Sequence, residues 1–270
     1  MTRRRIQNVL WKEWELLFTD VNTALMVTLL PLLIVGQGVL YIWLAVTFGG
    51  EAILGNPMFQ STLEKLRQAL PGMANLPQEQ QSQLLLLNQF NFFLLLIPTM
   101  IAMSVATFSI VDEKLSGSLE ALLATPVRTW ELLLGKALAG AIPALVMTWL
   151  SAGVFLLAMI GLGWGNLIAY VVTPAWFLSI FLLTPGVALL SFMLGVVASS
   201  RAKDARSAQT ISLLIILPVL AVIVLQVIGL IWFTPLLILA LALGLVVGDF
   251  VVLRIAVRLF QRESILVRWR

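Results

Sequence analysis

Apolar runs long enough to cross a lipid bilayer alternate with short polar segments along most of the chain. A membrane-spanning helix needs about 20 consecutive, mostly apolar residues. Runs of this kind predict six spans, over residues 22–48, 89–111, 132–160, 170–199, 211–230 and 235–257. The last two come from one long apolar stretch that Pro235 divides, because proline is favoured at the first position of a helix. We therefore expect an all-α polytopic membrane protein in which residues 1–270 form one transmembrane domain.

The first 20 residues follow a different pattern. Apolar Ile6, Leu10, Trp14 and Leu17 recur at helical spacing, and charged or amide side chains fill most of the opposite side. A helix with two such faces lies in the membrane interface or on the surface of a soluble domain. The span that follows at once favours an interfacial helix over residues 1–20. The basic start lacks the short apolar core of a cleavable signal peptide, so we expect this helix to be retained.

Composition supports lipid exposure and removes several kinds of chemistry. Hydrophobic residues make up 60% of the chain and charged residues 11%, whereas soluble domains have about 45–50% and about 25%. The chain has no cysteine and no histidine, which excludes disulfides and removes the commonest metal ligand and general base. The net charge of +4 is no sign of nucleic-acid binding in such a protein. We expect membrane lipids as partners, no nucleic acid and no metal.

The basic side chains predict how the spans are oriented. Of 17 Lys and Arg residues, 15 fall before the first span, in residues 112–136, in residues 201–206 or from Arg254 onward. In a six-span protein these four segments lie on one side, and only Lys65 and Arg67 lie on the other. Short basic segments stay in the cytoplasm. Both termini are therefore expected to be cytoplasmic, and the loop over residues 49–88 extracytoplasmic.

The polar segment 112–131, between the second and third predicted spans, is the most distinctive part of the chain. An acidic start leaves the membrane, and a short helix with leucines on one face follows; Thr125 and Pro126 then suit the start of the next helix. Two interpretations follow from the residues alone. The segment is an amphipathic connector lying on the membrane, or it is a surface on which another protein docks.

The string DEKLSGSLEALLATPVRTWELLLGK, residues 112–136, resembles the cytoplasmic coupling segment of ABC type-2 transporter permeases. It matches the acidic-Lys-x-x-Gly-Ser/Thr-Leu-Glu start, the Thr-Pro-Val-Arg centre and the Leu-Leu-Gly-Lys end of that segment. The resemblance covers the whole chain: LWKEWELLFTDVNTALMVTLLPLLI is similar to the interfacial helix and first span, ASSRAKDARSAQ to the second cytoplasmic loop, and LRIAVRLFQRESIL to the C-terminal end. The short outer loop departs from relatives with a large extracytoplasmic domain.

The resemblance implies the permease subunit of an ATP-driven exporter in the inner membrane of a prokaryote. Two copies would form the translocation pathway and pair through the first and fifth spans. Two copies of a separate ATPase subunit would dock beneath them and bind ATP and Mg. The implied docking residues are Asp112, Glu113, Gly117, Leu119, Glu120, Leu122, Leu123, Thr125, Pro126 and Arg128, and a second cytoplasmic contact is implied at Arg201, Lys203, Asp204 and Arg206.

The chain itself shows no ATPase motif. Gly135 and Lys136 are followed by alanine and lack the upstream glycine of the phosphate-binding pattern G-x-x-x-x-G-K-[S/T]. We therefore expect no enzymatic activity, no catalytic residue and no cofactor in this chain, and the exported substrate stays unidentified. The alternatives are a membrane-embedded lipid-modifying enzyme, which the scattered cytoplasmic carboxylates do not favour, and a non-transporting channel or scaffold.

Polar residues and prolines within the predicted spans leave further questions open. The amides form helix-to-helix hydrogen bonds or line a substrate path; they are Gln37, Asn88, Gln89, Asn91 and Gln226. For Asp249 we favour pairing with the nearby Arg254, or an interfacial position, over an ion site. The aromatic cluster FNFFLLL at 90–96 is interpreted as a lipid-facing or packing surface. Helix kinks are predicted at Pro31, Pro98, Pro143, Pro185 and Pro218.

Overall fold

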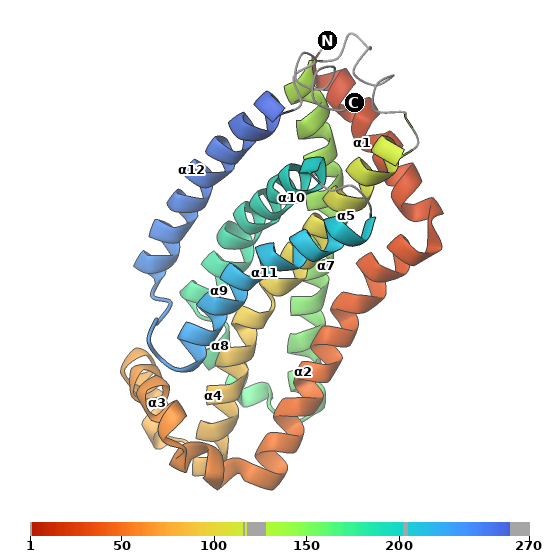
Figure 1. Cartoon of the computed structure of the whole chain (residues 1–270). Coiled ribbons are helices and arrows are strands. Elements are labelled where there is room, and N and C mark those ends of the chain that lie inside the picture. The colour runs from red at the N-terminus through yellow and green to blue at the C-terminus, as the bar shows by residue number, and fades with distance from the viewer. Residues whose placement is uncertain (1, 116, 118–127, 202–204, 260–270) are drawn as a thin grey trace.

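The computed structural model describes residues 2–115, 117, 128–201 and 205–259, and these residues form helices and turns without any strand (Figure 1). The expected all-α class is thereby confirmed. The helices are α1 (Thr2–Thr19), α2 (Val21–Gly55), α3 (Pro57–Ala69), α4 (Gln78–Phe93), α5 (Leu96–Leu115), α7 (Thr129–Gly161), α8 (Ile168–Val171), α9 (Pro174–Leu178), α10 (Thr184–Arg201), α11 (Ala205–Val227) and α12 (Pro235–Leu259). Short 3₁₀ turns η1 (Pro71–Asn75) and η2 (Gly165–Leu167) and a π-helical turn, η3 (Ser179–Leu183), complete the described elements.

Five stretches of the described residues are long and apolar enough to cross a membrane. They are Val21–Gly49, Gln78–Val111, Thr129–Gly161, Pro174–Ser200 and Pro235–Leu259. Each contains most of one predicted span. The remaining prediction, residues 211–230, falls on α11, where the apolar helix Ile216–Val227 is shorter than a span. The structure therefore shows a multi-pass helical protein with five candidate spans.

The second candidate span begins well before the predicted position. The prediction placed residues 78–88 in an outer loop because Gln78, Glu79 and their neighbours are polar. In the structure they form the first turns of α4, where Ser82 and Gln83 are buried with the leucines that follow. Polar side chains can enter a bundle when other helices surround them, so their polarity alone does not mark a loop.

Prolines account for the irregular points in two of the spans. Pro98 has no N–H to donate to the carbonyl of Leu94, and its ring crowds that carbonyl. The helix is therefore interrupted between Phe93, where α4 ends, and Leu96, where α5 begins. Pro185 has the same effect on the turn before it. There the chain adopts the π-helical turn η3, and the hydroxyl of Thr184 donates a hydrogen bond to the Ser179 carbonyl at 2.9 Å. The predicted kinks therefore appear here as a break and a widened turn.

Glycines let the central helices approach closely. A Cβ on Gly140 of α7 would lie 2.6 Å from the ring of Phe192, and a Cβ on Gly195 of α10 would lie 2.9 Å from Ala106 of α5. The buried core is built around α5, α7 and α10 in this way. In contrast, α2 and α12 leave many large apolar side chains exposed on the surface of the bundle, among them Leu33 and Leu243. These two outer helices present the surface that suits lipid.

The two ends of the bundle are built differently. Figure 1 shows α1 and the last turns of α12 at one end, and α3 at the other. At the α3 end, the terminal carbonyls of α11 accept hydrogen bonds from α3: Ser61 Oγ to Ile228 at 2.8 Å, Thr62 Oγ1 to Val227 at 2.8 Å and Lys65 Nζ to Gly229 at 2.5 Å. A helix C-terminus favours such donors because its last carbonyls have no intrahelical partner.

The first and fifth predicted spans are expected to pair between two copies, but two of their glycines make close contacts within a single chain. Gly229 has a φ of +74°, and a Cβ there would meet Ser61 Oγ at 2.5 Å. Gly38 of α2 faces the ring of Phe90 so closely that a Cβ would lie 1.9 Å from it. Both therefore serve packing inside the protomer, while Gly36 has open space beside it.

Candidate functional site

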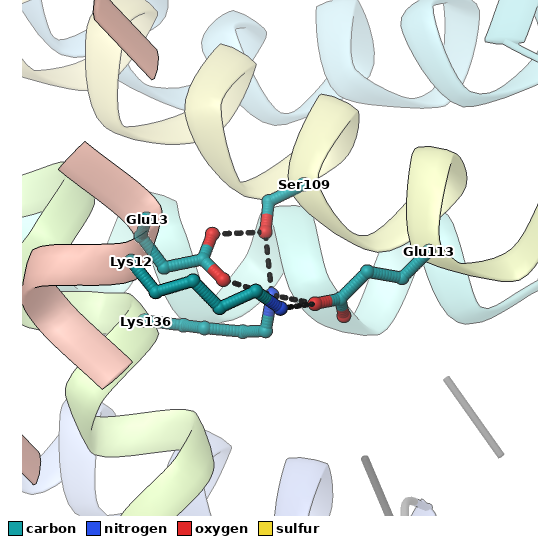
Figure 2. Close-up of polar contacts among 5 residues, drawn as sticks. All are labelled: Lys12, Glu13, Ser109, Glu113 and Lys136. Carbon is teal, nitrogen blue, oxygen red and sulfur yellow. Dashed lines mark hydrogen bonds and ion pairs between the residues drawn. The ribbon is translucent and has the colours of Figure 1, made fainter. Parts of the chain in front are cut away.

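Five side chains from three helices form a buried polar cluster at the α1 end of the bundle (Figure 2). We call Lys12, Glu13, Ser109, Glu113 and Lys136 the ion cluster. The ammonium of Lys136 on α7 donates to Glu13 Oε1 on α1 at 2.8 Å, to Ser109 Oγ on α5 at 2.6 Å and lies 2.9 Å from Glu113 Oε1. Ser109 donates in turn to Glu13 Oε2 at 2.7 Å, and Lys12 lies 3.5 Å from Glu113.

Most of the charged groups in the ion cluster are buried, so its stability depends on whether positive and negative charges balance. Lys136 is 1% exposed, Glu13 6% and Glu113 7%, while the Lys12 side chain reaches the surface. Two ammonium groups therefore meet two carboxylates. Removing a charge from water is costly, and the cost is offset only when good geometry pairs it with opposite charges. Lys136 bridges both carboxylates, so the three helices can bury these groups only together.

A second ionic contact lies a turn earlier on α7. Glu131 is 1% exposed and its carboxylate accepts a hydrogen bond from the backbone N–H of Arg128 at 3.1 Å. Glu131 also pairs with Arg5 of α1 at 3.5 Å. A carboxylate in the first turn of a helix satisfies free N–H groups and suits the helix dipole. The start of α7 is therefore fixed both to its own backbone and to α1.

Two features of the sequence bring these side chains together: a four-residue spacing on α5 and a glycine on α7 that lets α1 approach. Ser109 and Glu113 are four residues apart and thus share a face of α5. On α7, Gly135 stands immediately before Lys136, and a Cβ there would lie 2.9 Å from Val9 of α1. The missing side chain lets α1 approach α7, and the indole of Trp14 then donates to the Ala139 carbonyl at 3.0 Å. The same glycine thus brings Glu13 within reach of Lys136.

The consequence concerns the predicted coupling segment, residues 112–131. Glu113 stands at its first turn and pairs with Lys12 of α1, and Glu131 stands at its last residue and pairs with Arg5 of α1. Helix α1 therefore ties the two flanks of the segment to each other. A force applied to the segment would reach α5, α7 and α1 as one unit, because none of these helices can move alone without breaking buried ion pairs.

The structure locates only some of the predicted docking residues. Glu113 lies inside the ion cluster. Gly117 is exposed and has a φ of +70°, a conformation that glycine adopts without strain. Arg128 is exposed and caps α7. For Asp112 in α5, Arg201 at the end of α10 and Arg206 in α11, the structure describes the backbone but not the side chain. The remaining predicted residues lie outside the described residues: Leu119, Glu120, Leu122, Leu123, Thr125, Pro126, Lys203 and Asp204.

Sequence reasoning missed the ion cluster as a unit. The signals were a lysine in an apolar helix, at 136, and a serine four residues before Glu113. Neither signal predicts which residue the side chain will contact, because Glu13 is 123 positions from Lys136 along the chain. The acidic and Gly-Lys ends of the recognised string thus have roles inside the protein, where they hold α1 against α5 and α7.

The polar residues within the spans have mixed surroundings. Gln89 of α4 donates to the Val227 carbonyl of α11 at 3.3 Å, which supports a contact between helices for this residue. Asn88 donates to the Leu84 carbonyl of its own helix at 3.2 Å, so its bond does not decide between the two interpretations. The predicted partner of Asp249, Arg254, lies over the Phe250 ring at 4.3 Å. The Phe cluster packs, since Phe90 lies 5.1 Å from the Phe155 ring and Phe92 stacks on Phe233 at 4.3 Å. The packing interpretation of that cluster is therefore supported.

These features define a multi-pass helical membrane protein whose first helix is attached by ion pairs to both flanks of a polar segment between two candidate spans. A family model described as ABC-2 family transporter protein matches residues 7–261. The chain belongs to that family, which confirms the resemblance seen in the sequence. No curated protein and no solved structure matches the chain.

Proposed function

We propose that this chain is the permease subunit of an ATP-driven exporter. Two copies form the translocation pathway, and a separate ATPase subunit, also in two copies, supplies the energy by binding ATP and Mg. Membership of the ABC-2 transporter family supports the proposal. It does not favour the alternatives, a membrane-embedded lipid-modifying enzyme or a channel or scaffold without transport. The exported substrate is unidentified.

The observation that carries the proposal is the double attachment of α1 to the flanks of the 112–131 segment. A connector that only joins two spans has no need of buried charges on either side. A segment that transmits closure of an ATPase needs a rigid base, and the ion cluster and the Glu131 contacts provide one. The apolar face of Leu119, Leu122 and Leu123 would then enter a cleft on the ATPase, with Glu120 and Arg128 fixing its register.

The membrane arrangement that we propose has six spans, with both termini in the cytoplasm of a prokaryote. Two observations support a crossing by α11. Its C-terminal carbonyls are bound by α3, at the end of the bundle away from α1. The last turns of α12 lie at the same end as α1 (Figure 1), and two termini on one side require an even number of crossings.

The exposed apolar faces of α2 and α11 support pairing of two copies. Leu33 and Leu40 on α2, and Leu217 and Val224 on α11, are all exposed in the single chain. Twofold dimers are the commonest closed assembly, and two copies would double the number of helices around a pathway. The second cytoplasmic contact with the ATPase, at Arg201, Lys203, Asp204 and Arg206, would lie beneath this pathway.

Co-purification with the ATPase tests the proposal directly. We expect a complex of two permeases and two ATPases, with ATP-driven transport in proteoliposomes. Leu122→Asp should reduce both binding and transport, because an unpaired carboxylate in the docking cleft costs several kcal/mol. Glu120→Arg should reduce transport even where binding survives, because it reverses a charge that fixes the register of docking.

Glu79→Arg is the matched control for the charge reversal. Glu79 is exposed in the first turn of α4, so its reversal loses the same helix-dipole interaction of about 0.3–1 kcal/mol at a place where no ATPase docks. Transport should survive it. Wild-type binding and transport in both Leu122→Asp and Glu120→Arg would show that the segment is only a connector. A one-plus-one complex that transports would contradict the paired pathway.

A further inference from the structure

A cavity of about 530 Å³ lies between α1, the start of α2 and α5, at the end of the bundle that holds the ion cluster. Small-molecule sites in proteins commonly occupy about 300–1,000 Å³. The lining joins charged side chains to an apolar part, which is formed by Leu16, Leu17, Val105 and Phe108. A molecule that fits this cavity therefore needs both a charged and an apolar portion.

Two charged side chains of this lining, Lys12 and Asp20, are open to a ligand. The Lys12 side chain is 47% exposed, and it lies 3.5 Å from Glu113, farther than the 2.7–2.9 Å typical of a charge-assisted hydrogen bond. Asp20 is exposed at the other end of the lining. Hydrogen bonds from the hydroxyl and the N–H of Thr23 hold the pKa of Asp20 below its ordinary value, so its carboxylate stays charged at neutral pH.

The accessible charges of the cavity are of opposite sign and lie within reach of one small molecule. The buried carboxylates of Glu13 and Glu113 share the cation of Lys136, so a ligand meets mainly the ammonium of Lys12 and the carboxylate of Asp20. The helical course continues to Asp20, whose N–H donates to the Leu16 carbonyl at 3.2 Å. Eight residues of helical rise place the two residues about 12 Å apart along the axis, a span that the lysine stem and one head with charges of both signs can bridge.

The place of the cavity along the chain favours a lipid as the occupant. Asp20 directly precedes the first candidate span, Val21–Gly49. On α1, Trp11 and Phe18 are exposed, and aromatic side chains of this kind are typical of the depth at which lipid headgroups lie. A lipid whose head enters the cavity would leave its acyl chains along the exposed apolar surface of α2.

The two charges also limit which lipid head can bind. An anionic head would pair with Lys12 but would bring its negative charge toward Asp20. A zwitterionic head satisfies both residues. A primary ammonium donates three hydrogen bonds, and donation to a carboxylate is favourable, whereas a quaternary ammonium donates none and is recognised by cages of aromatic rings. Phe108 is the one aromatic residue among the described residues of the lining.

We propose that this cavity binds the head of phosphatidylethanolamine. The phosphate pairs with the ammonium of Lys12, the primary ammonium of the head pairs with the carboxylate of Asp20, and the glycerol portion lies against Leu16 and Phe108. The site does not rest on the proposed transport function, so either can fail without the other. Asp20 is not part of the ion cluster, and its variants therefore test the lipid site without removing a buried charge.

Photolabelling of the full chain in phosphatidylcholine nanodiscs tests the proposal. The probe is a trace of phosphatidylethanolamine with a diazirine near the glycerol end of one acyl chain, and mass spectrometry maps the labelled peptides. Probes with the same chains and a phosphatidylcholine or phosphatidylglycerol head are run in parallel. We expect the phosphatidylethanolamine probe to label residues 12–23 and 105–113 about three- to fivefold more than either, the effect of one exposed ion pair. Equal labelling of these residues by either of the other probes would overturn the proposal without any variant.

Charge variants at position 20 locate the site. Asp20→Asn removes the charge but keeps an acceptor for the Thr23 N–H, because asparagine caps a helix as well as aspartate does. Glu15→Gln is the matched control, since Glu15 is an exposed carboxylate of α1 outside the lining. Only Asp20→Asn should abolish the preference for the phosphatidylethanolamine probe, and Asp20→Lys should reverse it in favour of phosphatidylglycerol. An unchanged preference in Asp20→Asn, or an equal loss in Glu15→Gln, would contradict the site.

Discussion

Lys136 carries a full charge at a position that is 1% exposed, among helices composed almost entirely of apolar residues. Its ammonium donates hydrogen bonds to Glu13 and Ser109 and forms an ion pair with Glu113 at 2.9 Å, so two buried carboxylates share this cation. Replacement of such a group by an apolar one leaves the carboxylates without their shared cation. Breaking a buried ion pair by removing one partner typically costs about 3–5 kcal/mol.

The first prediction concerns this residue. Lys136→Met keeps the apolar stem but removes the ammonium, so Glu13 and Glu113 face each other with only the more distant Lys12 for charge compensation. We expect a clear decrease in the midpoint of thermal unfolding, measured by tryptophan fluorescence in nanodiscs, and partial release of α1, measured as faster proteolysis near Lys12.

A triple variant distinguishes lost charge pairing from lost packing. Lys136→Met combined with Glu13→Gln and Glu113→Gln is neutral at the buried positions, and replacing a whole buried ionic group is often tolerated where removal of one partner is not. It should therefore be more stable than Lys136→Met alone. A single variant as stable as wild type would mean that the ion cluster does not hold the three helices together.

At the scale of the element, the fit of α1 against α7 depends on Gly135. A Cβ there meets Val9 at 2.9 Å and the Ile6 carbonyl oxygen at 3.2 Å, so Gly135→Ala must push α1 away from α7. We expect lower stability and weaker coupling of ATPase activity to transport. Gly153→Ala is the matched control on the same helix, because nothing lies within 4 Å of its Cβ. Equal effects of the two substitutions would show that α1 is not seated on Gly135.

The elements differ in how far the sequence predicts them. Five of the six predicted spans and the amphipathic first helix follow from local patterns, because lipid exposure requires long apolar runs and an interface requires two faces. The start of α4 at Gln78 could not be predicted, since its burial depends on which helices surround it. The same holds for the ion cluster, whose members Glu13 and Lys136 are brought together only by packing, and for the π turn before Pro185.

The short helix that the sequence predicts over residues 119–124 lies outside the described residues, so it stays a prediction. Its flanks are described, and the structure adds to them a reason for rigidity that spacing did not show: Glu113 and Glu131 both connect to α1. The part of the recognised string with a structural role is thus separate from the part that would contact an ATPase. Variants of the two parts should differ, with stability changing in one case and docking in the other.

At the scale of the whole molecule, the bundle has an ionic end and a hydrogen-bonded end. The ion cluster joins α1, α5 and α7 at one end, while α3 binds the C-terminus of α11 and borders an apolar cavity at the other. Between them, α5 and α10 pack through Gly195. A displacement imposed beside the ion cluster would therefore be passed along closely packed helices toward the α3 end, as the proposed transport function requires.

The last prediction concerns the path of the chain through the membrane, and it uses the absence of cysteine from the natural sequence. Single cysteines are placed at exposed positions: Glu15→Cys on α1, Gln68→Cys on α3 and Arg258→Cys near the end of α12. Gln68 is preferred to Lys65, because Lys65 donates to the Gly229 carbonyl. We expect a membrane-impermeant maleimide to label Gln68→Cys in intact cells, and Glu15→Cys and Arg258→Cys only after permeabilisation.

Labelling of Arg258→Cys from outside, with Glu15→Cys protected, would give an odd number of crossings and show that α11 does not span the membrane. Labelling of Gln68→Cys only from the cytoplasm would invert the orientation that the basic residues predict.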